Sequence, residues 1–121
     1  MQKKLLEQNA IVKLSFDFSL KVIAYCEQLE VIRKFVITNQ LLRAGTSICA
    51  NAIEAQNAES KADFIHKMKV AAKEADETQY WLMLCDNSQN YPDCKTLIIK
   101  LEEIQRVLNK ILSTSKRKPS F

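Results

Sequence analysis

Four polar residues stand at helical spacing near the middle of the chain, inside the segment RAGTSICANAIEA (43–55). They are Arg43, Ser47, Asn51 and Glu54, at intervals of four, four and three residues. On a helix these intervals place all four side chains on one face, along about three turns. An arginine, a hydroxyl, an amide and a carboxylate in one row have the composition of a ligand-binding or catalytic groove, although nothing in the row positions a nucleophile.

The same row also suits a structural role. Small residues lie beside it on the same helix, among them Ala44, Gly45 and Ala52. Buried polar groups need partners, and the later segment that contains Lys73, Glu74 and Glu77 is placed to supply them across a helix–helix contact. The sequence therefore favours a polar network that sets the register of two helices, or an oligomer contact, over a catalytic groove.

Elsewhere the chain offers little that performs chemistry. Its one histidine, His66, belongs to a single Asp-x-x-His pair, whereas helical di-iron sites use two Glu-x-x-His pairs and further glutamates. The cysteines are Cys26, Cys49, Cys85 and Cys94, whose intervals of 23, 36 and 9 residues do not match a zinc site. We therefore predict a non-enzymatic protein without metal or cofactor, in which the cysteines are buried free thiols.

The composition predicts a single all-α domain over residues 1–121. The chain is 47% hydrophobic and 26% charged, which is typical of a folded globular protein. It has one Gly and two Pro, too few for the frequent turns of a β-sandwich or barrel. No apolar run reaches the length of a membrane span, and the first residues lack the pattern of a signal peptide. We expect a cytoplasmic protein that has no membrane partner.

Apolar periodicity predicts four helices at about residues 11–29, 35–56, 60–86 and 92–112, followed by a disordered basic tail over 115–121. The connections are short, which favours an antiparallel, up-and-down four-helix bundle. Ser60 and Asp63 form a capping-box pattern at the start of the third helix, and Pro92 suits the first turn of the fourth. A heptad seam from Phe64 to Cys85 indicates bundle packing along the third helix.

The first predicted helix has an unusually broad apolar face. One stripe contains Ile11, Phe18, Val22, Tyr25 and Leu29, and a neighbouring stripe contains Val12, Phe16, Ile23 and Cys26. A helix that packs in a single seam needs only one such stripe. The second stripe predicts contacts beyond the bundle to which the helix belongs.

The net charge of +4 is unevenly distributed, with seven basic residues against three acidic ones from Asp93 to Phe121. A basic segment of this kind attracts the phosphates of RNA or DNA. With the first loop included, the candidate phosphate-binding residues are Arg33, Lys34, Lys95, Lys100, Arg106, Lys110, Lys116, Arg117 and Lys118. The alternative interpretation is a solvated helix and tail without a partner.

Residues 40–82, QLLRAGTSICANAIEAQNAESKADFIHKMKVAAKEADETQYWL, resemble the four-helix bundle proteins named after the intervening sequences of the bacterial 23S rRNA gene. The matching positions are Gln40, Leu41, Arg43, Gly45, Ser47, Ile48, Asn51, Glu54, Ser60, Lys61, Asp63, Phe64, Lys73, Glu74, Glu77, Trp81 and Leu82. The segment KLSFDFSLKVIAY (13–25) fits the first helix of that family. The resemblance covers roughly residues 9–115.

This resemblance implies an up-and-down four-helix bundle that assembles as a ring-shaped homo-oligomer, in the form of a pentamer. Similar proteins include the accessory protein of diversity-generating retroelements, which partners a reverse transcriptase and binds nucleic acid through basic surfaces. We therefore expect an oligomeric module that binds structured RNA or another nucleic acid. The alternative is a protein-interaction scaffold or accessory subunit, for example of a reverse transcriptase, with no nucleic-acid role of its own.

Overall fold

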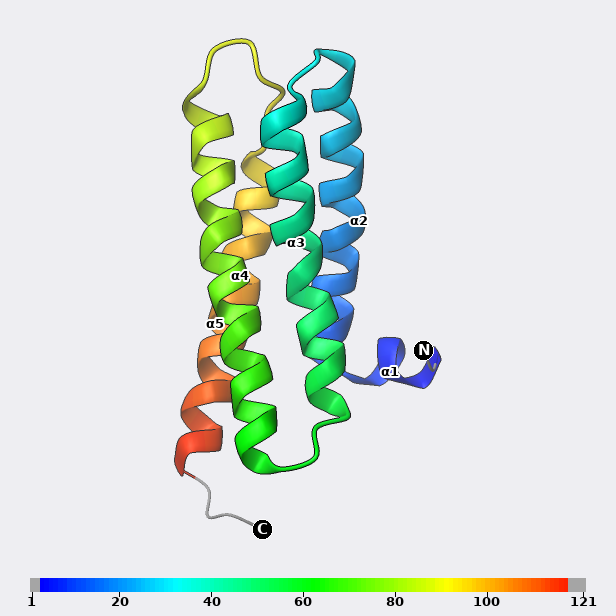
Figure 1. Cartoon of the computed structure of the whole chain (residues 1–121), viewed down its shortest axis with the longest axis vertical. Helices are drawn as coiled ribbons and strands as arrows, with labels where there is room; N and C mark the ends of the chain where they lie inside the picture. The colour runs from blue at the N-terminus through cyan, green and yellow to red at the C-terminus, as the bar shows by residue number, and fades with distance from the viewer. Residues whose placement is uncertain (1–2, 118–121) are drawn as a thin grey trace.

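The structure, a computed structural model, describes residues 3–117. Its helices are α1 (Lys3–Gln8), α2 (Ala10–Val31), α3 (Phe35–Gln56), α4 (Lys61–Asn87) and α5 (Lys95–Arg117). The long helices α2 to α5 run side by side in alternating directions, and α1 projects sideways from the start of α2 (Figure 1). Because α2 and α4 each pack against both α3 and α5, the long helices occupy the corners of a square. The described residues contain helices and turns but no strand, as the all-α prediction requires.

The N-terminal part of the chain differs from the prediction. The short helix α1 was not expected, and Asn9 separates it from α2. The Asn9 Oδ1 atom accepts a hydrogen bond from the Val12 amide at 3.1 Å, so a side-chain cap sets the start of α2. Apolar residues of α1, Leu5 and Leu6, pack against the edge of the core.

The last helix begins and ends later than predicted. It starts at Lys95 rather than at Pro92, because Asp93 Oδ1 accepts a hydrogen bond from the Lys95 amide at 3.2 Å and a carboxylate stabilises a helix N-terminus. Residues 115–117 continue α5, so the prediction of a disordered tail is wrong for them. The rest of the predicted tail, 118–121, lies outside the described residues.

The turns at the two ends of the bundle use different caps. Ser60 Oγ accepts a hydrogen bond from the Asp63 amide at 3.0 Å, so α4 begins at Lys61. The Asp63 carboxylate accepts from the Glu59 amide at 3.2 Å, one residue earlier than a capping box requires. At the opposite end, Arg33 has a φ of 63° and follows α2 as the left-handed residue of a Schellman motif.

The predicted apolar stripes form the core. The buried residues of the four long helices include Phe18, Val22, Leu29, Leu41, Ile48, Ala52, Met68, Ala71, Ala75, Leu82, Leu101, Ile104 and Leu108. Buried hydroxyls of Ser15, Thr38 and Thr78 each donate to a carbonyl of their own helix or its cap at 2.6–2.7 Å. Polar groups therefore enter the core without leaving an unsatisfied donor.

The only glycine of the chain lies where α3 meets α2. A Cβ atom at Gly45 would stand 3.0 Å from both Cγ atoms of Val22. That distance is shorter than normal carbon–carbon contact, so the missing side chain allows the two helices to approach closely. Gly45 thus has a packing function within the second predicted helix.

No helix among residues 3–117 combines the length and apolar character needed to cross a bilayer.

Candidate functional site

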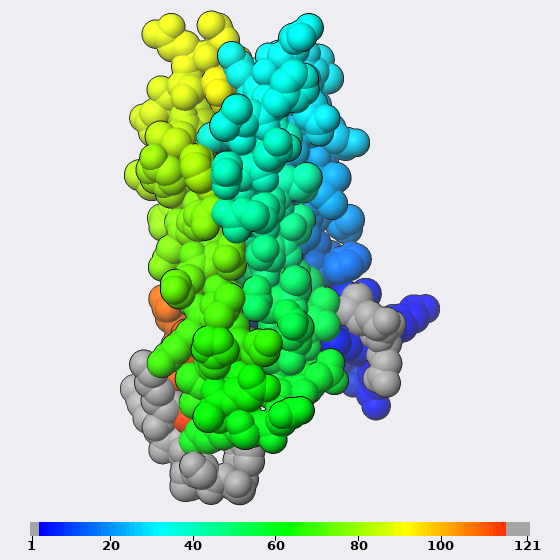
Figure 2. Space-filling view, in the orientation of Figure 1, coloured from blue at the N-terminus to red at the C-terminus, as the bar shows by residue number. Residues whose placement is uncertain are grey.

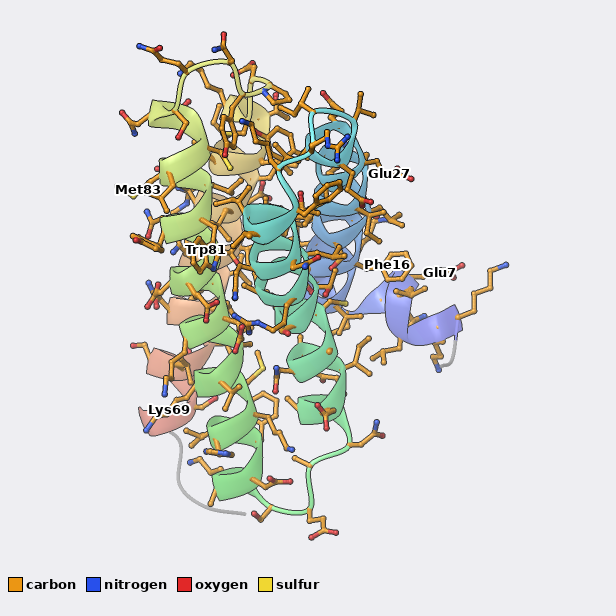
Figure 3. The ribbon with its side chains drawn as sticks, turned by 45° about the horizontal axis from the view of Figure 1, so that its top comes forward. Glu7, Phe16, Glu27, Lys69, Trp81 and Met83 are labelled. Carbon is orange, nitrogen blue, oxygen red and sulfur yellow. The ribbon has the colours of Figure 1, made fainter. Side chains whose placement is uncertain are left out.

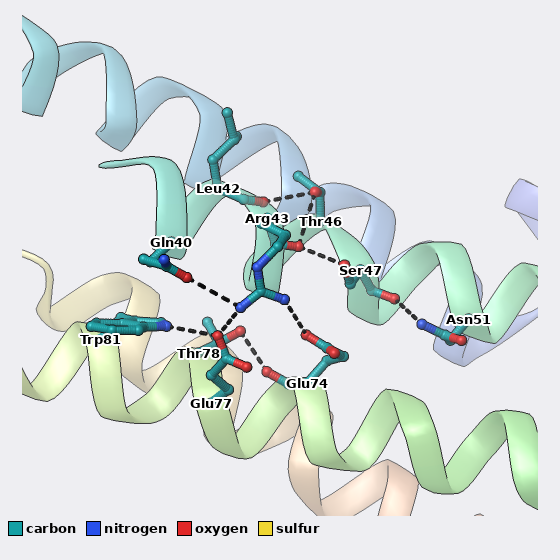
Figure 4. Close-up of polar contacts among 10 residues, drawn as sticks. All are labelled: Gln40, Leu42, Arg43, Thr46, Ser47, Asn51, Glu74, Glu77, Thr78 and Trp81. Atoms are coloured by element: carbon teal, nitrogen blue, oxygen red, sulfur yellow. Dashed lines mark hydrogen bonds and ion pairs between the residues drawn. The ribbon is translucent and has the colours of Figure 1, made fainter. Parts of the chain in front are cut away.

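Arg43 joins α3 to α4 through two carboxylates. Its Nη1 atom lies 3.4 Å from Glu74 Oε2, and its Nη2 atom forms an ion pair with Glu77 (Figure 4). Nη2 also donates to Gln40 Oε1 at 3.4 Å. Trp81 Nε1 donates to the same Glu77 oxygen at 3.0 Å, which holds that carboxylate in place. The guanidinium is therefore engaged from both helices, although half of the Arg43 side chain is exposed.

The other members of the polar row bond within their own helix or to a lysine. Ser47 Oγ donates to the Arg43 carbonyl at 2.6 Å, and Asn51 Nδ2 donates to the Ser47 carbonyl at 2.9 Å. Glu54 does not meet Arg43, and its Oε1 lies 3.7 Å from Lys67 Nζ instead. This row links α3 to α4 through two separate sets of ion pairs.

This geometry performs a structural task. The Ser47 hydroxyl donates its proton to the backbone carbonyl of Arg43 rather than to a catalytic base. Arg43 already meets two carboxylates, which leaves little of its charge for a substrate. Figure 2 shows α3 and α4 side by side as one continuous face of the molecule, and the Arg43 network lies across their junction.

The nine basic residues selected from the sequence do not come together. Arg33, Lys34 and Lys95 lie at the end of the bundle with the α2–α3 and α4–α5 connections, whereas Lys110 lies near the opposite end (Figure 1). Lys34 Nζ is 5.3 Å from the centre of the Tyr91 ring, and Lys95 Nζ is 3.2 Å from Asp86 Oδ1. Lys116 and Arg117 belong to the last turn of α5, and Lys118 lies outside the described residues. One surface cannot contain all nine.

All four cysteines are free and buried, as predicted. Burial raises the pKa of the Cys26 thiol to about 12 and that of Cys85 to about 11, and it also raises the pKa values of Cys49 and Cys94. Burial likewise raises the pKa of Tyr25, whose hydroxyl donates to the Pro92 carbonyl at 2.8 Å. The thiols therefore remain protonated at neutral pH and are poor nucleophiles.

A pocket of about 260 Å³ lies between α4 and α5. Its lining residues are Ala72, Asp76, Gln105, Leu108 and Asn109. Gln105 Nε2 donates to Asp76 Oδ1 and to Gln79 Oε1, both at 3.2 Å, so two of the lining side chains, Asp76 and Gln105, bond to each other. Within residues 3–117, no group of three or more His, Cys, Asp or Glu side chains is arranged to hold a metal ion.

Residues 7–110 match the family model described as 23S rRNA-intervening sequence protein. The chain belongs to this family. It is also similar to a crystal structure of a protein with unknown function from the S23 ribosomal protein family of Bacteroides thetaiotaomicron. The two chains are 36% identical with a TM-score of 0.80, over 84% of this chain and 97% of the other. Among curated proteins, no significant match is found.

In this member of the 23S rRNA-intervening sequence family, the basic residues of α4 were not among the phosphate-binding candidates, and Lys73 was expected to face the polar row of α3. Lys69 and Lys73 belong to a segment, residues 35–90, in which acidic residues outnumber basic ones. The structure turns the neighbouring Glu74 and Glu77 toward Arg43 of α3, while Lys69 and Lys73 are exposed. Helical spacing places Lys69 one turn before Lys73, and it places the acidic residues Asp76 and Glu77 about one turn after it.

Proposed function

We propose that the protein is a non-enzymatic, self-associating helical bundle that binds RNA or another nucleic acid through basic residues. The observation that carries the proposal is the separation of charge along the bundle. The half that holds the α3–α4 connection, here called the basic half, comprises residues 3–20, 47–74 and 106–117. It contains eleven Lys or Arg residues against six Asp or Glu residues. The other half, residues 21–46 and 75–105, contains six against eight.

A phosphate backbone is attracted to the end of a protein where cations exceed carboxylates, and its counterions are released on binding. The expected mode is neutralisation of phosphates without reading of bases, because phosphate contacts position a nucleic acid and carry no sequence information. Such binding does not depend on base sequence and weakens steeply as salt is added.

A filter-binding titration with a structured RNA at about 50 mM and about 200 mM salt tests this proposal. We expect saturable binding at the lower salt concentration and a large loss of affinity at the higher one. A neutral protein of similar size serves as the control. RNA binding no tighter than that of the control would refute the proposal.

Self-association is supported by the outer side of α2. Leu20 is 53% exposed and Ile23 of the second apolar stripe is 41% exposed, whereas Val12 and Cys26 of that stripe are buried within the bundle. Apolar side chains left at the surface of one copy are buried when copies assemble. The family resemblance adds a ring, with five copies as the expected number.

Light scattering tests the assembly against a protomer mass of 13.9 kDa. We expect a mass close to five times that value for the native chain and a much smaller mass for Leu20→Asp/Ile23→Asp. Ala50→Asp, at an exposed position of α3, is the matched control and should leave the mass unchanged. A native mass of one protomer would refute self-association.

A second candidate function, a protein-interaction scaffold, is supported by the half opposite the basic one, here called the apolar half. Among the described residues, nine of the ten exposed large hydrophobic side chains lie there, and the tenth, Leu20, is at its border. Val31 and Val36 are each 82% exposed beside the α2–α3 turn. This candidate and nucleic-acid binding use different halves, so loss of one by mutation leaves the other measurable.

A further inference from the structure

An exposed apolar surface lies on α4 in the apolar half of the bundle. Tyr80, Met83 and Leu84 are 54%, 53% and 39% exposed. Residues three and four positions apart are neighbours on a helix surface, so Met83 and Leu84 both adjoin Tyr80. Figure 3 shows Met83 pointing away from the bundle and Trp81 on the side toward α3. The Tyr80 and Trp81 ring centres are 5.0 Å apart, so these four side chains form one surface, here called the aromatic patch.

The helix α3 extends the aromatic patch across its junction with α4. Arg43 of α3 and Glu77 of α4 meet at this junction. Seven residues are close to two helical turns, so a step of seven returns to the same face of each helix. Because the two helices are antiparallel, Val36 of α3 therefore lies level with Leu84 of α4. Val36 is 82% exposed, so the apolar surface continues from one helix to the other.

Acidic residues adjoin the aromatic patch on the side of the α3–α4 connection. Asp76 and Glu77 lie four and three residues before Tyr80, which makes both of them its neighbours on the helix surface. Asp76 is exposed, and the side chain that donates to it, Gln105, is neutral. The negative charge of Asp76 is therefore available to a partner that covers Tyr80.

The cations around the patch are fewer than the acids. The charged residues that surround it are Lys73, Glu74, Asp76, Glu77 and Asp86 of α4, Arg43 of α3 and Lys95 of α5. They comprise four acidic and three basic residues, and the apolar half as a whole has eight acidic against six basic residues. The surroundings of the patch are thus negative, although the net charge of the chain is +4.

This combination of side chains suits a helix of another protein. Tyrosine, tryptophan and methionine are enriched where protein interfaces are fully covered, and methionine adapts its shape to different apolar partners. An amphipathic helix presents an apolar stripe to such a surface through residues three and four positions apart. Its polar edge beside Asp76 has to be basic, because a carboxylate there would face a like charge.

We propose that the aromatic patch docks an amphipathic helix of a partner protein that carries lysine or arginine along its polar edge. The apolar stripe of that helix packs on Tyr80, Met83 and Leu84, and its cations face Asp76. This inference rests on the second candidate function, the protein-interaction scaffold, and specifies its surface and its class of partner. It leaves out Val31, because α2 lies diagonally across the bundle from α4.

Fluorescence anisotropy with two labelled synthetic helices tests the proposal. The two peptides have equal length and the same stripe of leucines, and one carries lysines on its polar face where the other carries glutamates. We expect the native chain to bind the lysine peptide about tenfold more tightly, and we expect added salt to reduce this preference. A general attraction to a chain of net charge +4 would favour the glutamate peptide instead.

Substitutions locate the surface. Tyr80→Ala/Met83→Ala should weaken binding of the lysine peptide about tenfold, because both side chains lie at the centre of the contact. Asp76→Asn keeps an acceptor for Gln105 and should narrow the difference between the two peptides. The matched control, Val31→Ala, removes an apolar side chain that is 82% exposed on α2 and should change the affinity less than about twofold. Circular dichroism verifies the fold of each variant, and light scattering measures its mass.

The outcomes distinguish the partner, the surface and the proposed function. Equal or tighter binding of the glutamate peptide would overturn the basic partner, and native affinity in Tyr80→Ala/Met83→Ala would overturn the surface. A smaller mass of that variant than of the native chain would show that the patch joins copies of this chain, which contradicts the proposal. Binding of neither peptide would overturn the inference as a whole. The RNA titration of the native chain is a separate measurement, so failure of the proposed nucleic-acid binding is a different result.

Discussion

The two halves of this bundle share one core and have opposite surfaces. The basic half carries an excess of lysine and arginine and, apart from Leu20 at its border, exposes no large hydrophobic side chain among the described residues. The apolar half has more acidic than basic residues and exposes Val31, Phe35, Val36 and Tyr80 among others. Because the helices alternate in direction, each surface is assembled from separate segments of the chain.

This difference teaches that the charged residues of a helical bundle have to be grouped by their position along the bundle axis rather than by their position in the sequence. Lys34 and Lys110 are both basic candidates by sequence, yet they lie toward opposite ends. Lys69 belongs to an acidic segment of the sequence and to a basic part of the surface. The comparison can be tested through the stability of each half as well as through binding.

The largest expected effect is a loss of stability in alkali, and it arises in the apolar half. Burial raises the pKa values of Cys26 and Cys85 to about 12 and about 11, from an ordinary value of 9.0. Their stabilising contribution is complete below pH 9 and is lost as pH rises through the folded-state values, because the unfolded chain releases these protons first. We expect the free energy of unfolding to fall by about 4 kcal/mol between about pH 9 and pH 11, roughly 2 kcal/mol for each thiol.

Urea denaturation across this pH range measures the effect. Cys26→Ala/Cys85→Ala should flatten the dependence on pH, even though the variant is less stable overall. Cys49→Ala, in the basic half, removes one buried thiol and should flatten the dependence less. An unfolding free energy that does not change between these pH values would contradict the assignment.

The next effect concerns the close contact of α2 and α3. Gly45→Ala should cost about 1 kcal/mol, because the new methyl group meets Val22 and this crowding exceeds the gain in helix propensity. Val22→Ala alone should cost about 2 kcal/mol through the cavity that it leaves. The double variant should be more stable than the sum of the single effects by about 1 kcal/mol, since the new methyl group enters that cavity. Strict additivity in urea denaturation would argue against this packing.

The two sets of ion pairs between α3 and α4 allow the stability of the two halves to be compared directly. Arg43→Met should destabilise the protein by about 1 kcal/mol, because Glu74 and Glu77 are left close together without a cation. Lys67→Met removes a single 3.7 Å pair with Glu54, whose side chain is 57% exposed, and should cost less than about 0.5 kcal/mol. Thermal denaturation at low salt measures both, and a larger cost at Lys67 would reverse the comparison.

The effects at the turns are also of about 1 kcal/mol or less, and they have opposite signs. Arg33→Gly should stabilise the apolar end by about 0.5 kcal/mol, because Arg33 has a φ of 63° that glycine adopts without strain. Ser60→Ala should destabilise the basic end by about 1 kcal/mol through loss of the cap on the Asp63 amide. Melting temperatures that shift in the same direction for both variants would contradict these roles of Arg33 and Ser60.

Much of the fold follows from local patterns in the chain. The apolar stripes of Val22, Leu41, Leu82 and Leu101 predicted which helix faces are buried, since periodicity is a property of each helix alone. The helix ends were less predictable. Asn9 and Asp93 compete with other polar residues as caps, and only the folded chain shows which side chains reach an amide.

The candidate site was predicted in part. The pairing of Arg43 with Glu74 and Glu77 was anticipated from the spacing of the residues and the need to satisfy charge. The pairing of Glu54 with Lys67 was missed, because the register between α3 and α4 decides which residue faces which. The α4–α5 pocket was missed for a similar reason, since α4 and α5 are separate segments that only packing brings together.

The amino-acid sequence by itself determined the class of fold, the buried faces and the membership of the family. These depend on periodicity and on a long run of matched residues, both of which are present in the unfolded chain. Only the tertiary structure decided that the bundle has a basic half and an apolar half. The reason is that antiparallel packing places segments that are distant in the sequence side by side at the same level of the bundle axis. Electrostatic attraction depends on this distance in space.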